Sequence, residues 1–281
     1  MKNRARFVSV RGVKLRLSFI DFINALPLQW GFTCRQFPDL FEISYDPPAV
    51  CADRLASGDA DVGLIPAIEY QRIAGLRVIP GMAIASKKQV ESVLFVSRKP
   101  IRDVRSVALD TSSRTSAALI QLLLRRKFFI KPEFRPARPD LEQMLEECDS
   151  ALIIGNPALL VSRERYLVFD LVEQWAEWTG RPFVFAFWAV RDGVDMAPYL
   201  RYFVESKVYG LSHIDDIADF ASSEIAASRA VILDYLEDKL NYDLDSENLR
   251  GLELFYRMAA SEGLVDSPRL LRFVESVQTG V

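Results

Sequence analysis

The residues best suited to chemistry stand together in the run from Asp110 to Ser116, which reads DTSSRTS. Residues 106–109 before it are short and apolar and predict a buried strand, whereas residues 117–129 after it are rich in Ala and Leu and predict a helix. The first N–H groups of a helix are unpaired and its dipole places positive charge there, so this helix end can bind a small anion. The hydroxyls of Thr111, Ser112, Ser113, Thr115 and Ser116, with the Arg114 guanidinium, would serve as donors. The alternative is that one Ser only caps the helix and the others are solvated.

A second polar group occupies a similar position near the N-terminus. Residues 14–20 (KLRLSFI) predict a strand, and residues 25–32 predict a short helix with Pro27 in its first turn. Asn24 would then stand at the helix N-cap, at the carboxyl end of a strand, which is where ligands of α/β sheets bind. Asn24 is therefore interpreted either as a plain cap or as a carboxamide directed into a cleft.

The order of the predicted elements indicates two α/β units followed by a helical segment. In the first unit, strands alternate with helices, which predicts a covered parallel sheet. These strands are expected at residues 14–20, 41–45 and 61–66, and the helices at 25–32, 48–57 and 67–72. Two long strands then follow at residues 76–85 and 90–97, and strands of this length can cross between two lobes. From residue 198 on the pattern is helical, with helices expected at residues 198–209, 214–223, 224–239 and 246–262, the last with a core-facing stripe of Leu249, Leu252, Phe255, Tyr256 and Ala259.

The second alternation of strands and helices fills the middle of the chain and indicates an inserted lobe. We expect one lobe from residues 1–100 together with residues 189–281, and an inserted lobe from residues 101–188. Two lobes joined by two crossings enclose a ligand and can close by hinging. The predicted fold class is therefore α/β, a two-lobed, type II periplasmic-binding-protein-like fold with a ligand cleft between the lobes.

Composition excludes several classes of function. With 281 residues, 50% hydrophobic residues and a net charge of −3, the chain is typical of a globular protein and lacks the basic character of a nucleic-acid-binding protein. No apolar run is long enough for a membrane helix, and the basic N-terminus is not followed by the apolar core of a signal peptide. Three scattered cysteines indicate a reducing cytoplasm, and a single histidine, His213, excludes a multi-histidine metal site.

Six longer stretches carry a resemblance to a known family. They span residues 14–262 approximately and comprise residues 22–28 (FINALPL), 61–70 (DVGLIPAIEY), 90–97 (VESVLFVS), 111–119 (TSSRTSAAL), 154–159 (IGNPAL) and 175–190 (WAEWTGRPFVFAFWAV). On these stretches the sequence resembles the chorismate dehydratase family of the futalosine route to menaquinone, a family of cytoplasmic enzymes. Two positions depart from the family pattern: Phe22 stands where Tyr is usual, and Asn156 stands where Asp is common.

The resemblance implies a reaction without metal or cofactor, in which chorismate loses water to give 3-[(1-carboxyvinyl)oxy]benzoate. A proton leaves ring carbon C3, hydroxide leaves C4, and the ring becomes aromatic. The resemblance also implies roles for residues. One substrate carboxylate would lie at the helix end that carries Ser113, Arg114, Thr115 and Ser116. The other carboxylate, with the departing oxygen, would lie near Ser86, Ser92 and Asn24, and Asn24 would be the catalytic donor to developing negative charge.

The base that takes the C3 proton stays open among Asp21, Glu69 and the substrate's own side-chain carboxylate, and we favour the last. Three other functions are weighed. A naphthoate synthase of the same pathway needs a histidine base, but His213 lies in the helical segment, outside every stretch expected to face the cleft. A solute receptor would need an export signal, and the sensing domain of a regulator would need a DNA-binding segment. Trp178, Phe183 and Trp188 are expected to pack in the core and not against a substrate ring.

Overall fold

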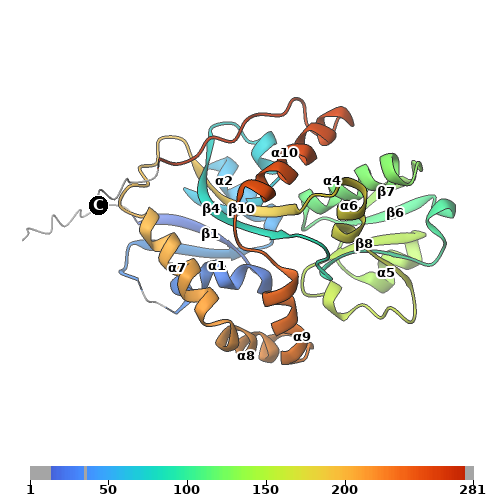
Figure 1. Cartoon of the computed structure of the whole chain (residues 1–281), viewed down its shortest axis with the longest axis horizontal. Helices are drawn as coiled ribbons and strands as arrows, with labels where there is room; N and C mark the ends of the chain where they lie inside the picture. The colour runs from blue at the N-terminus through green and yellow to red at the C-terminus, as the bar shows by residue number, and fades with distance from the viewer. Residues whose placement is uncertain (1–13, 35–36, 276–281) are drawn as a thin grey trace, which may run out of the picture.

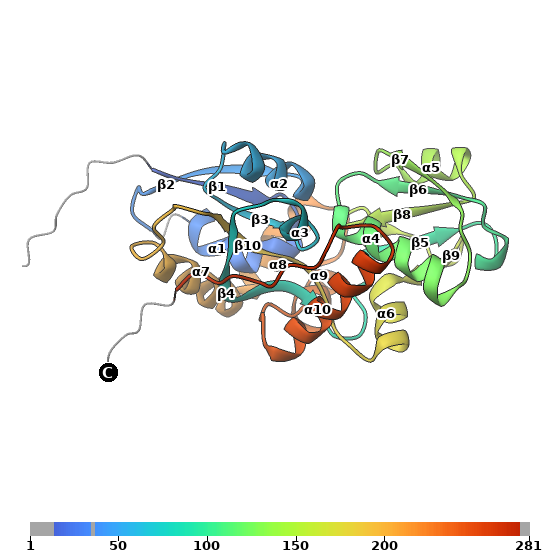
Figure 2. The same cartoon turned by 90° about the horizontal axis from the view of Figure 1, so that it is seen from above.

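Two five-stranded sheets form the centres of two lobes in the computed structural model, which describes residues 14–34 and 37–275 (Figure 1). The lobes lie side by side, with helices around each sheet (Figure 2). This confirms the predicted two-lobed α/β architecture. The basic N-terminal residues that were weighed as a signal peptide lie outside the described residues.

The sheet of the first lobe has the strand order β2-β1-β3-β10-β4. Its strands β1, β2 and β3 are parallel, as predicted from the alternation of strands and helices, whereas β10 runs antiparallel to β3 and β4. The strands are β1 (Leu15–Ile20), β2 (Phe41–Asp46), β3 (Val62–Pro66), β4 (Leu76–Ser86) and β10 (Phe183–Arg191). The connecting helices are the 3-10 turn η1 (Ile23–Ala25), α1 (Leu26–Thr33), α2 (Pro48–Ser57) and α3 (Glu69–Arg72).

The sheet of the second lobe has the order β7-β6-β8-β5-β9, in which β6, β7 and β8 are parallel and β5 is antiparallel to its two neighbours. Its strands are β5 (Val93–Ser97), β6 (Ser106–Asp110), β7 (Glu133–Ala137), β8 (Ser150–Ile154) and β9 (Leu167–Asp170). The helices are η2 (Ile101–Asp103), α4 (Arg114–Leu122) with its π-helical continuation η3 (Leu123–Lys127), α5 (Leu141–Glu147), η4 (Ala158–Leu160) and α6 (Leu171–Thr179).

The chain crosses between the sheets twice, and both crossings lie earlier in the sequence than the expected lobe boundaries after residues 100 and 188. The first crossing is residues 87–92, because β5 already pairs with β8 and β9 in the second sheet. The second is residues 180–182, because β10 pairs with β3 and β4 in the first sheet. Both β5 and β10 are buried, continuously apolar strands, so their sequence does not reveal which sheet receives them.

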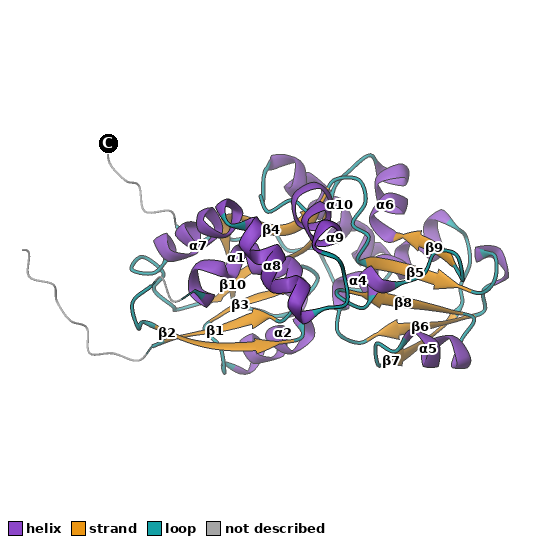
Figure 3. Cartoon of the chain, turned by 90° about the horizontal axis from the view of Figure 1, so that it is seen from below, coloured by secondary structure: helices purple, strands orange, loops and turns teal. Residues whose placement is uncertain are grey.

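The C-terminal helices complete the first lobe and reach the second. They are α7 (Leu200–Ser212), α8 (Ile214–Glu224), α9 (Arg229–Asp234), its π-helical continuation η5 (Tyr235–Lys239) and α10 (Ser246–Ser261). The helix expected over residues 224–239 begins only at Arg229, because Ser228 caps it by accepting a hydrogen bond from the N–H of Val231. Figure 3 shows α9 near the middle of the molecule, where the two lobes meet.

Aromatic packing joins α10 to both lobes. The ring of Phe255 lies 6.2 Å from that of Trp175 on α6 and 5.0 Å from that of Phe183 on β10, measured between centroids. The buried face of α10 carries Leu252, Phe255, Tyr256 and Ala259, with Leu249 partly buried beside them, which confirms the predicted core stripe. Trp178, Phe183 and Trp188 likewise pack in the core.

Candidate functional site

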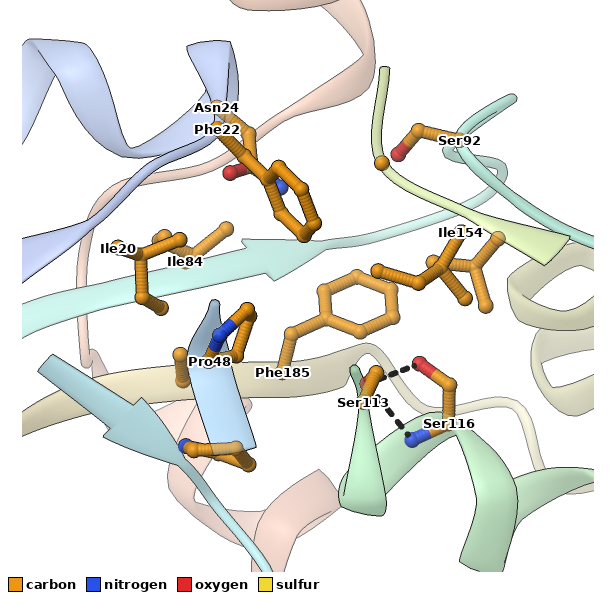
Figure 4. Close-up of a pocket in the computed structure, with 14 residues that line it drawn as sticks. Ile20, Phe22, Asn24, Pro48, Ile84, Ser92, Ser113, Ser116, Ile154 and Phe185 are labelled. Atoms are coloured by element: carbon orange, nitrogen blue, oxygen red, sulfur yellow. Dashed lines mark hydrogen bonds between the residues drawn. The ribbon is translucent and has the colours of Figure 1, made fainter. Parts of the chain in front are cut away.

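A small cavity of about 40 Å³ lies between the two lobes (Figure 4). Three of the residues that line it are the last residues of strands: Ile20 of β1, Pro66 of β3 and Ile154 of β8. The cavity therefore lies at the carboxyl ends of strands from both sheets, where ligands of α/β folds bind. Its other lining residues are Phe22, Asn24, Pro48, Ile84, Ser92, Val93, Ser113, Ser116, Gly155, Phe185 and Ala186.

One polar end of the cavity is the N-terminus of α4. Ser113 is the N-cap of α4: its Oγ accepts a hydrogen bond from the N–H of Ser116 at 3.3 Å and donates to Ser116 Oγ at 2.9 Å (Figure 4). The hydroxyl proton of Ser113 is used in this hydrogen bond, whereas the hydroxyl of Ser116 can still donate to a ligand. Together with the positive end of the helix dipole, this arrangement suits a carboxylate.

The opposite polar end is formed by Asn24 and Ser92. The interpretation of Asn24 as an N-cap is wrong, because Asn24 lies inside the turn η1, Ala25 is the N-cap of α1, and no side-chain cap hydrogen bond is present at either helix. Within the described part of the chain, Asn24 Oδ1 is buried without a hydrogen-bond partner. The carboxamide is therefore held at the cavity without a capping role.

Two aromatic side chains separate the polar ends. Figure 4 shows the rings of Phe22 and Phe185 between Asn24 and Ser92 on one side and Ser113 and Ser116 on the other. Gly155 makes room for Phe22, because a Cβ at this position would lie 3.0 Å from the Phe22 ring; its φ of +67° also favours glycine. The cavity thus combines an apolar centre with two hydroxyl-bearing or amide-bearing ends.

Thr115 and Arg114 lie beside the cavity and contact the opposite lobe. Thr115 Oγ1 accepts a hydrogen bond from the N–H of Ile68 at 3.2 Å. The Arg114 guanidinium forms ion pairs with Asp53 of α2, at 2.9 Å, and Glu69 of α3, at 3.0 Å. Neither side chain lines the cavity, and both connect the lobes in the conformation seen here.

Two further hydrogen bonds join the lobes beside the cavity, and together with the contacts of Thr115 and Arg114 they form the seam between the lobes. The N–H of Ala49 donates to the Ser112 carbonyl at 3.1 Å. The N–H of Ile23 donates to Asn156 Oδ1 at 3.3 Å, so Asn156 serves here as an acceptor between the lobes. With these contacts in place, the cavity holds only one or two water-sized molecules, and a larger ligand requires the lobes to separate.

Ser86 is the remaining predicted contact residue, and the structure does not bring it to the cavity. Its hydroxyl is buried and donates to the Gln89 carbonyl at 2.7 Å, where it stabilises the first crossing. Ser92, at the end of the same crossing, does line the cavity.

The residues that line the cavity include no carboxylate and no histidine. Asp21 is exposed, and Glu69 is buried but paired with Arg72 and Arg114. Among the described residues, no three His, Cys, Asp or Glu side chains gather in a way that suits a metal ion. None of the described helices has the length and apolarity needed to cross a bilayer.

Asp110 is a buried carboxyl group next to this site. It ends β6, and its Oδ1 accepts hydrogen bonds from the N–H and the hydroxyl of Ser112 at 2.8 and 2.6 Å. Burial raises the pKa of Asp110, and the hydrogen bonds from Ser112 lower it only in part. The group therefore favours its neutral form more than an exposed Asp does.

Sequence reasoning did not assign Phe185 or Gly155 to the site. Gly155 had a usable signal, because Gly-Asn-Pro directly follows the apolar residues that end β8 at Ile154, as Asn24 follows β1. Phe185 had none, because it is one apolar residue in the continuously apolar strand β10.

The sequence matches known proteins over most of its length. Residues 15–261 match the profile of a protein family described as menaquinone biosynthesis. The chorismate dehydratase of Thermus thermophilus is 26% identical over 234 residues, which cover 76% of this chain and 85% of that protein.

Solved structures show the same fold. Protein AF1704 of Archaeoglobus fulgidus superposes with a TM-score of 0.74 at 17% identity, over 90% of this chain and 98% of that one. The periplasmic aliphatic sulphonate binding protein SsuA of Escherichia coli gives 0.60 at 15% identity, over 95% and 96%. The fold is therefore that of periplasmic binding proteins, as predicted. Because the family profile covers most of its length, the chain belongs to the menaquinone biosynthesis family.

Proposed function

We propose that this protein is a chorismate dehydratase, a cytoplasmic lyase that converts chorismate to 3-[(1-carboxyvinyl)oxy]benzoate and water. The observation that carries the proposal is the pairing of two polar ends across an apolar centre in one cavity between the lobes. Chorismate has the matching form, a ring with two carboxylates and a hydroxyl. The relative from Thermus thermophilus, named for this activity, supports the same assignment.

In the proposed complex, the substrate ring lies between Phe22 and Phe185. One carboxylate accepts hydrogen bonds from Ser116 and from N–H groups at the start of α4. The C4 hydroxyl is directed to Asn24 and Ser92, which donate to the oxygen as the C4–O bond breaks. Holding this carboxylate and the C4 hydroxyl fixes the ring and lowers the entropic part of the barrier.

The C3 proton goes to the carboxylate of the substrate's own side chain in this proposal. The reason is that no side chain among the lining residues is a carboxylate or an imidazole. The protonated side-chain carboxyl group then passes this proton to the hydroxide that leaves C4, which regenerates the carboxylate and releases one water. Formation of the aromatic ring drives the elimination. The protein then needs only to orient the substrate, stabilise the departing oxygen and exclude solvent.

Closure of the lobes is part of the proposed cycle. The cavity is too small for chorismate while the seam contacts are intact, so the lobes must separate for entry and come together around the ring. Periplasmic-binding-protein folds close by such a hinge. Arg114, with Asp53 and Glu69, would then stabilise the closed state and would not bind the substrate directly.

The test is incubation of the purified protein with chorismate, followed by ultraviolet absorbance and mass analysis of the product. We expect a product lighter than chorismate by one water, formed without added metal, and a strongly reduced rate for Ser116→Ala. Release of pyruvate, or tight binding of chorismate without turnover, would contradict the proposal. The second outcome would indicate a solute-binding protein.

A further inference from the structure

The hydroxyl of Tyr235 reaches the cavity region from the C-terminal helical segment. Tyr235 begins η5 and is about 2% exposed. Its hydroxyl donates a hydrogen bond to Ser92 Oγ at 2.7 Å, a contact between residues 143 positions apart in the sequence. Ser92 itself lines the cavity, so Tyr235 stands directly behind a residue of the proposed site.

This hydrogen bond determines what Ser92 can offer to a ligand. A serine hydroxyl has one proton to donate and two lone pairs to accept. Because Tyr235 donates to Ser92 Oγ, one lone pair is occupied on the protein side and the Ser92 proton remains free to point into the cavity. The bond also polarises the Ser92 hydroxyl and makes it a better donor.

The Tyr235 phenol is protonated, as a donor to Ser92 must be. Burial raises the pKa of Tyr235 far above its ordinary value, and hydrogen bonding by Ser92 and Asn24 partly opposes this shift. The phenol therefore stays protonated at neutral pH and acts as a donor. Tyr235 and Ser92 thus form a hydrogen-bonded pair, and Asn24 lines the same cavity as Ser92.

We propose that Tyr235 is a positioning residue for this site. It orients the Ser92 hydroxyl so that Ser92 donates a hydrogen bond to the oxygen that leaves C4 of the substrate. The inference rests on the proposed function. It assigns a role to the C-terminal helical segment, which neither the sequence motifs nor the cavity lining include. Tyr235 itself does not touch the substrate; its effect passes through Ser92.

The chain offers a matched control in Tyr242, seven positions further on. Tyr242 is about 4% exposed, and in the described part of the chain its hydroxyl is buried without a hydrogen-bond partner. Tyr242→Phe therefore removes a similarly buried oxygen from a neighbouring site without changing Ser92. A general effect of losing a buried tyrosine hydroxyl would appear in both variants.

The experiment is a double-mutant cycle on the full chain with chorismate as substrate. We expect Tyr235→Phe to lower kcat about 10-fold with little change in KM, and Tyr242→Phe to keep wild-type kcat. Ser92→Ala should lower kcat by at least as much, and the double variant Ser92→Ala with Tyr235→Phe should equal Ser92→Ala alone. Melting temperatures of all four variants identify any that do not fold.

Three results would overturn the inference: an unchanged kcat for Tyr235→Phe, an equal loss for Tyr242→Phe, or a full additional loss in the double variant. If Tyr235→Phe does not fold, 3-fluorotyrosine at position 235 takes its place, since it keeps the shape and changes only the acidity of the donor. It should then alter kcat several-fold, and the same replacement at position 242 should not. If wild-type protein does not convert chorismate at all, the proposed function fails, whereas wild-type turnover with an insensitive Tyr235 refutes only this inference.

Discussion

Asn24→Ala gives the sharpest separation of a catalytic role from a structural one. The Asn24 side chain caps no helix, and among the described residues its Oδ1 is buried without a partner. Removing an unpaired buried acceptor relieves a desolvation cost, which offsets the packing lost with the amide. We therefore expect the free energy of unfolding to change by less than about 1 kcal/mol, which corresponds to a shift in Tm of about 2–4 °C or less.

The expected effect on turnover is much larger. A donor to the departing oxygen acts in the transition state, and loss of one such donor typically costs about 10²–10³ in kcat, or about 3–4 kcal/mol. The assay is kcat and KM for chorismate by ultraviolet absorbance, with Tm measured on the same preparation. Ser18→Ala is the matched control, because Ser18 Oγ is also buried without a partner in the described structure and does not line the cavity. A wild-type kcat for Asn24→Ala would show that Asn24 does not stabilise the departing oxygen.

Three further predictions concern charged or titratable groups near the site. Arg114→Ala should lower KM for chorismate with a smaller change in kcat, because it removes the ion pairs with Asp53 and Glu69 that hold the lobes in the closed conformation, which has no room for the substrate; a fall in kcat alone would contradict this. His213→Gln should keep kcat within a few-fold, because His213 stacks on the ring of Tyr209 at 3.9 Å, away from the cavity, and a thousandfold loss in a folded variant would indicate a histidine base. For Asp110 the folded pKa is raised, so the wild-type protein loses stability as pH rises through that pKa, whereas Asp110→Asn does not titrate there. The Tm of Asp110→Asn relative to wild type should therefore increase between pH 4 and pH 7, and a constant difference would show that the group does not titrate in this range.

The local pattern of the sequence was enough to predict the strands, most helices and the two polar ends of the cavity. Ser113 and Ser116 were found because polar residues follow an apolar strand and precede an Ala- and Leu-rich helix, a pattern that is visible without the tertiary fold. Asn24 was placed at the right strand end for the same reason. Its capping role was predicted wrongly, because the short turn η1 comes before α1 and moves the cap to Ala25.

Features that depend on contacts between distant segments could not be predicted in this way. Arg114 was expected to bind a carboxylate of the substrate, but in the structure it pairs with carboxylates of the opposite lobe, and nothing near Arg114 in the sequence indicates this. Tyr235 lies on an apolar helix face typical of a core residue, and only the tertiary fold places its hydroxyl next to Ser92. The crossings between the sheets differ from the expected lobe boundaries for the same reason. The strands β5 and β10 are continuously apolar, so their sequence does not show which sheet they join.

In the proposed complex, chorismate binds in the cavity between the lobes, with its ring between Phe22 and Phe185. The most direct test is a crystal structure of the Asn24→Ala variant, in which turnover is slow, after soaking with chorismate. We predict one carboxylate of the ligand within hydrogen-bonding distance of Ser116 Oγ and the C4 oxygen within the same distance of Ser92 Oγ. Two results would contradict this binding mode. One is a ligand bound outside the cavity, and the other is a ligand with its carboxylates near position 24 and Ser86 and none at the start of α4.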